Sequence, residues 1–375
     1  MTVPDQKLPT NVLKFNPNEA DPVVELLQLL KKSLSARVPE PFCSILLAVI
    51  LTLLLFGTVA VAALAQGIFT NFRDDIAAPI QFGLLNPLTI VLVLLYYRQV
   101  ETVFNAAQEY VDIPDVELSK LKSWMQGWYQ SRVLLLLSGF SALMGTSGFF
   151  YVRYSVEGAY YFGCYPIPCM RIGGLLTISG LLTFMWGALV TYIVVVWGCK
   201  NIITVLGFLR LFTFSMNYQP LHTDARAGLG KVGSLFSLVG FIVLIVGITL
   251  VVFLVPLIKS QPQTAILWGV PYGLPYLILP LLLYVFSIYA IHRKMIEGKK
   301  EFLEQLVAKE FSSAGSRGIL DYYKLIKELP EWPLSFQGVL PIVGSLTLLA
   351  GQFLSSEMGK LIPKIWEELK KVLPA

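Results

Sequence analysis

The sequence predicts an all-α fold, a polytopic transmembrane helix bundle, and two observations lead to this fold class. The first is composition: 55% of the 375 residues are hydrophobic and 14% are charged, whereas a soluble domain carries about 25% charged residues. The second is distribution, because the apolar residues form blocks longer than the roughly 18 residues that cross a bilayer. Only a helix satisfies its own backbone polar groups in lipid, so each block is expected to be helical.

Six blocks are predicted spans of a transmembrane domain over residues 42–291, because they lack Asp, Glu, Lys, Arg and His except at their ends. They are Phe42–Ile68, Pro79–Tyr97, Val133–Val152, Ile172–Gly198, Val232–Ile258 and Trp268–Ile291. The remaining parts are an N-terminal segment (1–41), a helical segment (292–337) and a C-terminal region (338–375).

The distribution of basic residues predicts the orientation of these spans. Of the 29 lysines and arginines, 21 lie in the N-terminal segment, the second and fourth loops and residues 292–337. The first, third and fifth loops together hold four. Positive charge is retained on the cytoplasmic side, so we expect a multi-pass protein of the inner or plasma membrane with its N-terminus in the cytoplasm.

The N-terminal segment contains a predicted amphipathic helix over residues 16–37. Asp21 is suited to the N-cap and Pro22 to the first turn. Apolar residues then recur at helical spacing from Val23 to Leu34. We expect this helix to lie on the membrane surface or to pack on the cytoplasmic ends of the spans.

The second loop is predicted to be helical and cytoplasmic. We expect the second span to continue to about Tyr110, the chain to turn at Pro114, and a helix capped by Asp115 to run through Trp124 and Trp128.

The sixth span is similarly expected to continue to about Phe311, with an ion pair between Lys300 and Glu304 on its surface. A short helix over Ile319–Leu329 follows. Such rigid extensions are suited to connect a cytoplasmic region to the membrane.

The C-terminal apolar segment Gly338–Leu354 has three interpretations: a seventh span, a re-entrant segment, or a helix packed on the cytoplasmic ends of the others. The last two are favoured, because a seventh span would place the lysines that follow outside. Glu357–Leu373 is predicted to be an amphipathic surface helix.

The cysteines divide by their predicted side of the membrane. Cys164 and Cys169 fall in the third loop, outside, where disulfides persist, and we hypothesise a bridge between them. Two free thiols or a metal pair are the alternatives. Cys43 and Cys199 lie near the inner face and should be free.

The start of the fifth span is a candidate anion site. Gly228, Gly230 and Gly233 match the dinucleotide spacing, but an apolar span follows where that fold requires a strand and a later acidic residue. Glycines at a helix N-terminus, beside Arg226 and Lys231, are instead suited to a lipid phosphate. A flexible turn is the alternative.

One face of the fourth span carries small and hydroxyl residues every four positions: Ser179, Thr183, Gly187 and Thr191. This ladder is suited either to line a neutral pore or to allow close helix packing.

Two prolines are candidate hinges. Pro280 lies well inside the sixth span and Pro87 follows Asn86 in the second; each removes a backbone donor and frees a carbonyl one turn back.

A stretch from His222 to Leu229 resembles a pattern found in a poorly characterised family of bacterial multi-pass membrane proteins. There the pattern runs His-Pro-Asp and then Gly-Gly-Leu, whereas Thr223 and Ala227 stand here for the proline and one glycine. Leu329-Pro-Glu-Trp-Pro333 is similar to a later element of that family. The resemblance implies a membrane location and no particular activity.

Three functions are compatible with these features. The first is a homo-oligomeric ion channel, gated through its cytoplasmic helices. The second is a non-catalytic membrane sensor or scaffold that binds a partner. The third is a membrane enzyme or lipid transporter using His222 and Asp224, although no familiar catalytic motif, cofactor motif or metal site is expected. Membrane lipids and copies of the chain itself are the expected partners; nucleic acid is not, because the basic residues form no tract.

Overall fold

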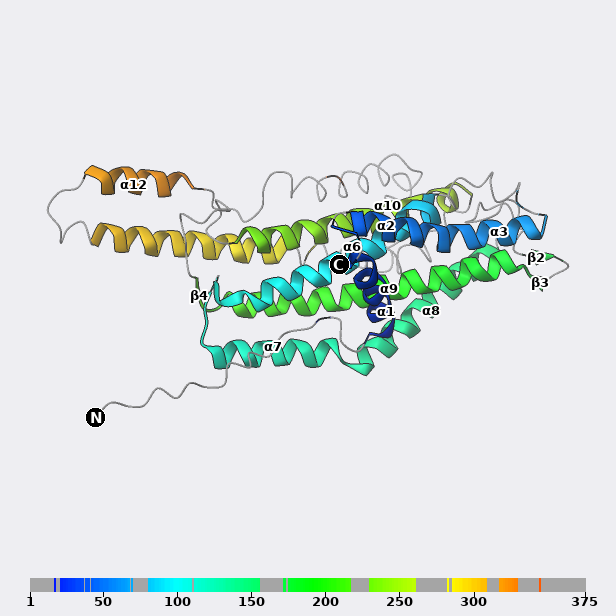
Figure 1. Cartoon of the computed structure of the whole chain (residues 1–375), viewed down its shortest axis with the longest axis horizontal. Coiled ribbons are helices and arrows are strands. Elements are labelled where there is room, and N and C mark those ends of the chain that lie inside the picture. Colours follow the sequence, from blue (N-terminus) through cyan, green and yellow to red (C-terminus); the bar gives the residue numbers. More distant parts are fainter. Residues whose placement is uncertain are drawn as a thin grey trace, which may run out of the picture.

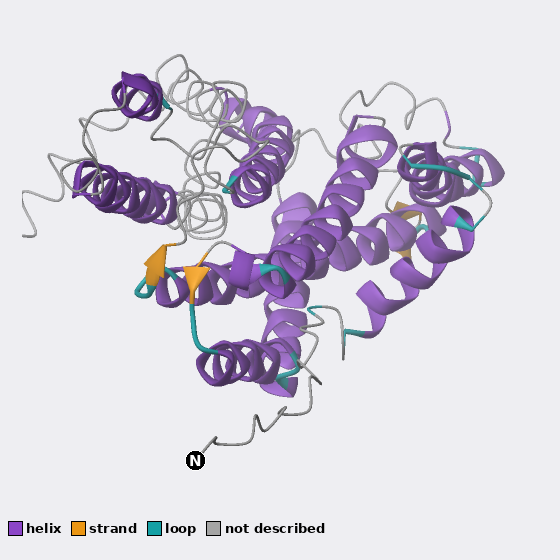
Figure 2. Ribbon diagram, turned by 60° about the vertical axis from the view of Figure 1, so that its left-hand side comes forward, coloured by secondary structure: helices purple, strands orange, loops and turns teal. Residues whose placement is uncertain are grey.

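The structure is a computed structural model, and helices make up nearly all of the part that it describes (Figure 2). The described residues are 17, 21–36, 38–40, 42–67, 69, 80–109, 111–155, 171–172, 175–216, 229–260, 282, 285–308, 317–329 and 344.

The helices run mostly along one long axis (Figure 1). In chain order they are α1 (Pro22–Ser35), α2 (Phe42–Thr52), the π-turn η1 (Leu53–Gly57), α3 (Thr58–Ala65), the π-turn η2 (Gln81–Leu85), α6 (Asn86–Asn105), the 3-10 turn η3 (Ala107–Glu109), α7 (Asp115–Tyr129), α8 (Arg132–Ser155), α9 (Ile178–Leu211), α10 (Gly230–Ser260), a helix over residues 285–308, and α12 (Arg317–Glu328).

Two pairs of short antiparallel strands lie at opposite ends of the bundle. β1 (Val111–Asp112) pairs with β4 (Ser215–Met216), and β2 (Arg171–Ile172) pairs with β3 (Leu175–Leu176). The first pair joins the α6–α7 connection to the chain that follows α9.

Four helices of the described part are long and apolar enough to cross a bilayer. They cover Phe42–Ala65, Gln81–Asn105, Ile178–Leu211 and Gly230–Thr249, which contain most of the first, second, fourth and fifth predicted spans. The third predicted span lies within α8, and the last residues of the sixth lie in the helix over 285–308. Apart from residues 282 and 344, the remainder of the sixth span and the segment 338–354 lie outside the described residues, so a total of six spans stays a prediction.

α6 lies at the centre of the bundle, and it is buried on most of its circumference. Twelve of its 20 residues are buried, and it contacts α1, α2, α9 and α10. The faces of α2, α3 and α8 that point away from α6 carry exposed large apolar side chains, as expected of helices that contact lipid.

The fourth span does not end where the sequence suggests. We expected Lys200 in a loop beyond Gly198, but α9 is one helix of 34 residues through Leu211. At 1.5 Å per residue it is about 51 Å long, well beyond the ~30 Å hydrocarbon thickness. Apolar residues continue past Lys200 without a glycine pair or proline to end the helix, so Lys200 is an interior residue of α9.

Pro87 lies in a continuous helix, preceded by a π-turn. Because proline has no N–H, the carbonyl of Gly83, four residues back, cannot receive its α-helical bond. The hydroxyl of Thr52, on α2, donates to that carbonyl at 2.9 Å. A side chain of a neighbouring helix therefore replaces the missing donor, which explains how the proline is tolerated within a span.

The predicted helices outside the spans that fall within the described residues are confirmed, with differences at their ends, whereas Glu357–Leu373 lies outside the described residues and stays a prediction. α6 ends at Asn105 and not near Tyr110, and Pro114 occupies the N-cap of α7 in place of Asp115. The predicted pair of Lys300 and Glu304 is present at 3.8 Å, on an exposed surface.

Replacing Thr52 by valine should destabilise the protein by about 1–2 kcal/mol, because the partly buried Gly83 carbonyl would lose a hydrogen-bond donor. Thr52→Ser, which keeps the hydroxyl, is the matched control and should unfold near wild type. Unfolding in mixed detergent micelles measures both. Equal stability of the two variants would contradict the role assigned to this hydroxyl.

Candidate functional site

The candidate site is a group of buried polar residues where α1, α6, α7 and α9 meet, here called the polar junction. Its members are Asp21, Tyr96, Tyr97, Tyr129, Lys200, Asn201 and Thr204. The Asp21 and Lys200 side chains are both 0% exposed. A fully buried charged residue is uncommon unless it is paired, so these two residues stand out among those described.

Asp21 is placed by the start of α1. It is the N-cap residue, and its Oδ1 accepts hydrogen bonds from the amides of Val23 at 3.2 Å and Val24 at 3.3 Å. The predicted cap is therefore confirmed. Its second oxygen, Oδ2, faces the Lys200 ammonium at 4.0 Å.

Lys200 is placed by the middle of α9, and its ammonium is held by three kinds of contact. It donates a hydrogen bond to the carbonyl of Pro17 at 3.1 Å. It lies 4.0 Å from the carboxylate of Asp21. It also lies 5.1 Å from the ring centroid of Tyr97 and 5.5 Å from that of Tyr129, within the range of cation–π attraction.

A chain of hydroxyl groups connects α6, α7 and α9 around this ammonium. The Tyr129 hydroxyl donates to the backbone carbonyl of Lys200 at 3.1 Å and makes a short hydrogen bond with Thr204. The Tyr96 hydroxyl lies 2.8 Å from the Thr204 hydroxyl and 3.0 Å from the side-chain oxygen of Asn201. The junction thus joins three long helices and α1 through polar contacts.

The charge pair is an orienting contact more than a source of stability. Two unit charges 4 Å apart attract by about 4 kcal/mol at an effective dielectric constant near 20. The free-energy cost of removing both charges from water offsets most of this attraction. Replacing a buried ion pair by apolar residues therefore often leaves the stability of a protein unchanged. Loss of one partner is different, because it leaves the other charge buried and uncompensated.

Several polar atoms at the junction have no hydrogen-bond partner within the described part of the chain. They are Asp21 Oδ2, Tyr97 Oη, Asn201 Nδ2 and Trp197 Nε1, the last beside Tyr96. Buried polar groups are normally satisfied, so this region has polar capacity beyond what its packing uses.

The α7 side of the junction also carries shifted titrating groups. Burial raises the pKa of Tyr129, so its hydroxyl stays protonated and can keep donating at physiological pH. Burial lowers the pKa of Lys122, two turns earlier on α7, whose side chain is 1% exposed and whose amine has no hydrogen-bond partner. Both shifts arise because burial disfavours the charged form.

The predicted anion site is only partly described. Gly230 is the first residue of α10 and Lys231 the second, and Lys231 lies 3.7 Å from Glu109 on an exposed surface. Arg226 and Gly228 lie outside the described residues, as do His222 and Asp224. Lys231 thus has a carboxylate neighbour where a phosphate was expected.

The small-residue ladder of α9 faces neighbouring helices. Ser179 and Thr183 are buried, and the Thr183 hydroxyl donates to the Ser179 carbonyl at 2.8 Å. A Cβ placed on Gly187 would lie 3.8 Å from the Thr146 side chain on α8. Thr191 is half-buried. In one chain, this arrangement is that of close helix packing.

The remaining candidates have simple outcomes. Cys43 and Cys199 are free cysteines, as expected. Cys164, Cys169 and Pro280 lie outside the described residues, so the bridge and that hinge stay predictions. Within the described ranges, no group of three or more His, Cys, Asp or Glu side chains could hold a metal ion.

The fold defines this chain as a helical membrane protein, with a polar junction at one end of its spans. No protein-family model matches the chain, and neither a curated protein nor a solved structure matches it.

A double-mutant cycle should show that Asp21 and Lys200 act as a pair. Lys200→Met alone should cost about 3–5 kcal/mol, because it leaves a buried carboxylate uncompensated. Asp21→Asn preserves the N-cap and removes only the charge. The free energy of unfolding of the double variant should exceed the value expected from adding the two single-variant effects by at least about 1 kcal/mol.

Lys120 and Glu117 provide the matched control, since they form an exposed pair at 2.7 Å. Their coupling should be below about 1 kcal/mol. Additive effects of Asp21→Asn and Lys200→Met would show that the two charges are not energetically linked.

Proposed function

We propose that this chain is a non-catalytic membrane sensor or scaffold, in which a helical layer at the cytoplasmic ends of the spans presents a surface to a partner. The observation that carries the proposal is the Asp21–Lys200 contact at 4.0 Å between two fully buried side chains. It connects the N-terminal helix directly to a span. Buried ion pairs contribute little net stability but can specify one arrangement of the helices that they connect. Such a pair can therefore hold α1 in one position until a signal displaces it, as a sensor requires.

The continuity of the core across the membrane boundary supports this function. Beyond the length needed to cross lipid, α6 and α9 stay in contact through Phe104 and Phe208, whose rings lie 4.5 Å apart, and α10 joins them through Phe236 at 5.7 Å from Phe208. α7 approaches α9 so closely at Gly207 that an added Cβ would lie 2.5 Å from Met125 Sδ. The proposal requires that these packed helices move as units, so that a displacement in the spans reaches the layer outside them.

α12 is held on this layer by a specific contact. The buried amine of Lys299 donates to the carbonyls of Lys327 at 2.8 Å and Leu329 at 3.0 Å, at the C-terminal end of α12. A cation at this end of a helix satisfies its last carbonyls and its dipole. On α12 itself, Ile326 is buried while Leu325 is half exposed, which leaves an apolar position for a partner.

The channel hypothesis has less support in the geometry. In the ladder that could line a pore, Ser179 and Thr183 are buried and Gly187 lies close to Thr146 of α8, and the centre of the bundle is filled by α6. A conducting path would therefore have to lie between copies of the chain.

Two experiments on full-length protein separate these functions. Purified wild-type protein in planar bilayers should show no conductance; single-channel currents would contradict the proposal in favour of the channel.

In membranes of the source cell, a photoreactive residue at Leu325 or Trp128, both half exposed, should form discrete adducts with another protein. These adducts should weaken in the Lys200→Met background. The same residue at Leu136 on α8 is the control and should give lipid adducts. Adducts with a second copy alone would contradict the scaffold function.

A further inference from the structure

α1 carries apolar residues on two sides, and only one side packs against other residues of the described part of the chain. Val24 is buried, and Leu27 and Leu34 pack against the core. Leu26 and Leu29 on the other side are 61% and 58% exposed, with Leu30 beside them. A helix of a soluble surface would carry polar residues there.

Both ends of α1 are fixed at the level where spans leave the hydrocarbon. Its N-cap Asp21 contacts Lys200, which lies 22 residues along α9 from Ile178. That is about 33 Å at 1.5 Å per residue, close to one hydrocarbon thickness. At the other end, the Cys43 thiol, in the first turn of α2, lies 3.5 Å from the carbonyl of Lys31.

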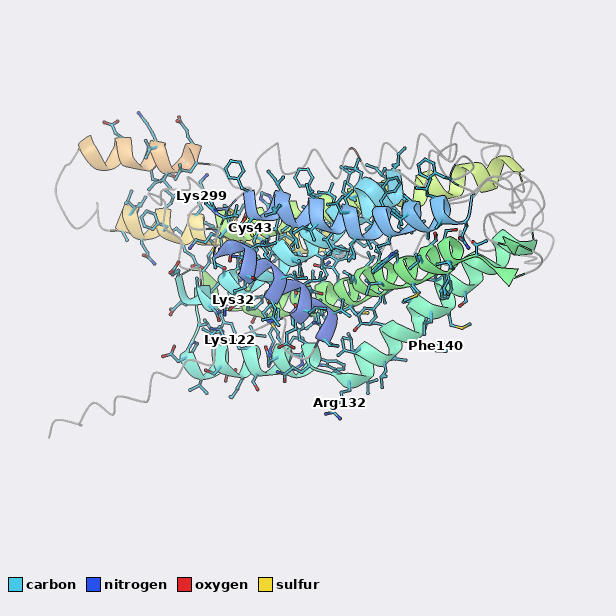
Figure 3. All side chains as sticks on the ribbon, turned by 45° about the vertical axis from the view of Figure 1, so that its right-hand side comes forward. Lys32, Cys43, Lys122, Arg132, Phe140 and Lys299 are labelled. Atoms are coloured by element: carbon cyan, nitrogen blue, oxygen red, sulfur yellow. The ribbon has the colours of Figure 1, made fainter. Side chains whose placement is uncertain are left out.

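α1 therefore crosses the bundle at the membrane boundary. Figure 1 shows it standing across the long helices that it contacts, and Figure 3 shows it crossing them obliquely. A helix that connects two points at one depth lies parallel to the membrane plane, which is the orientation of interfacial amphipathic helices.

The exposed side of α1 continues surfaces that face lipid. Phe42 and Ile45 at the start of α2 are exposed, and so are Val133 and Leu136 at the start of α8. These spans begin at the level of α1, so the same lipids that cover them reach its outer leucines.

Basic side chains border this surface. Lys32 on α1 and Arg132 at the start of α8 are both exposed and are labelled in Figure 3. Cations at this depth attract anionic headgroups, by about 1 kcal/mol each near a charged surface.

We propose that the outer face of α1, formed by Leu26, Leu29, Leu30 and Lys32, is a lipid-binding surface. Its leucines lie at the boundary between headgroups and acyl chains, and its lysine contacts anionic headgroups of the same leaflet. This inference concerns the contact with lipid and does not depend on the scaffold function.

Collision accessibility of a nitroxide label tests this directly, in full-length protein whose four cysteines are replaced. Leu29→Cys is the test position, Leu136→Cys on α8 the lipid reference and Lys324→Cys on α12 the water reference. In nanodiscs, the label at position 29 should collide readily with oxygen and rarely with a water-soluble nickel chelate, as at position 136. An unaltered melting temperature confirms folding of each variant.

Two outcomes would overturn the proposal. A label at position 29 that matches position 324 would place α1 in water. A label shielded from both reagents, with spin–spin broadening, would show a second copy on this face. The contact with anionic headgroups is tested by adding phosphatidylglycerol to phosphatidylcholine nanodiscs. The label at position 29 should then lie deeper in the membrane when Lys32 is present, and its depth should not change in the Lys32→Met variant. An equal response of the two would overturn the headgroup contact.

Discussion

The contact between Lys200 and Asp21 fixes how the rest of the molecule is arranged. A lysine inside a continuous helix must be neutralised where that helix leaves lipid, because an isolated buried charge is strongly disfavoured. The partner comes from the N-terminal segment, and this requirement holds α1 across the ends of the spans. Tyr97 and Tyr129 complete the surroundings of the ammonium, so α6 and α7 are held by the same constraint.

The lengths of α6 and α9 determine what the Asp21–Lys200 contact can influence. Because α6 and α9 extend past the hydrocarbon, the core does not end at the membrane, and aromatic packing continues through Phe104 and Phe208. In the proposed arrangement, the polar junction lies where the hydrocarbon and the aqueous phase meet. A change in lipid that displaces α1 would act on Asp21 directly, and the same packed helices would carry the displacement toward α12. The proposed lipid surface and the proposed sensor function are thus compatible while resting on separate contacts.

Much of the fold follows from the sequence, because long uncharged blocks permit few alternatives. The spans, the cap at Asp21 and α7 after Pro114 are set by local chemistry. Sequence reasoning does not predict the polar junction, because it assigns Lys200 to the basic residues of the fourth loop. Mostly apolar residues continue from Ile202 to Leu211, and this continuity is the signal in the sequence for an interior lysine. Its pairing with Asp21, 179 positions earlier, depends on tertiary structure and has no local signature.

Hydrogen–deuterium exchange of wild type and Lys200→Met in nanodiscs tests the central claim most directly. If the buried pair holds α1 in place, backbone amides of α1 will exchange faster in the variant, and so will those of α7 near Tyr129. The amides of α12 will exchange as in wild type, because the internal hydrogen bonds of α12 and its contact with Lys299 persist even when the helix is displaced as a unit. Identical exchange of α1 in the two proteins, with the variant still folded, would contradict the account.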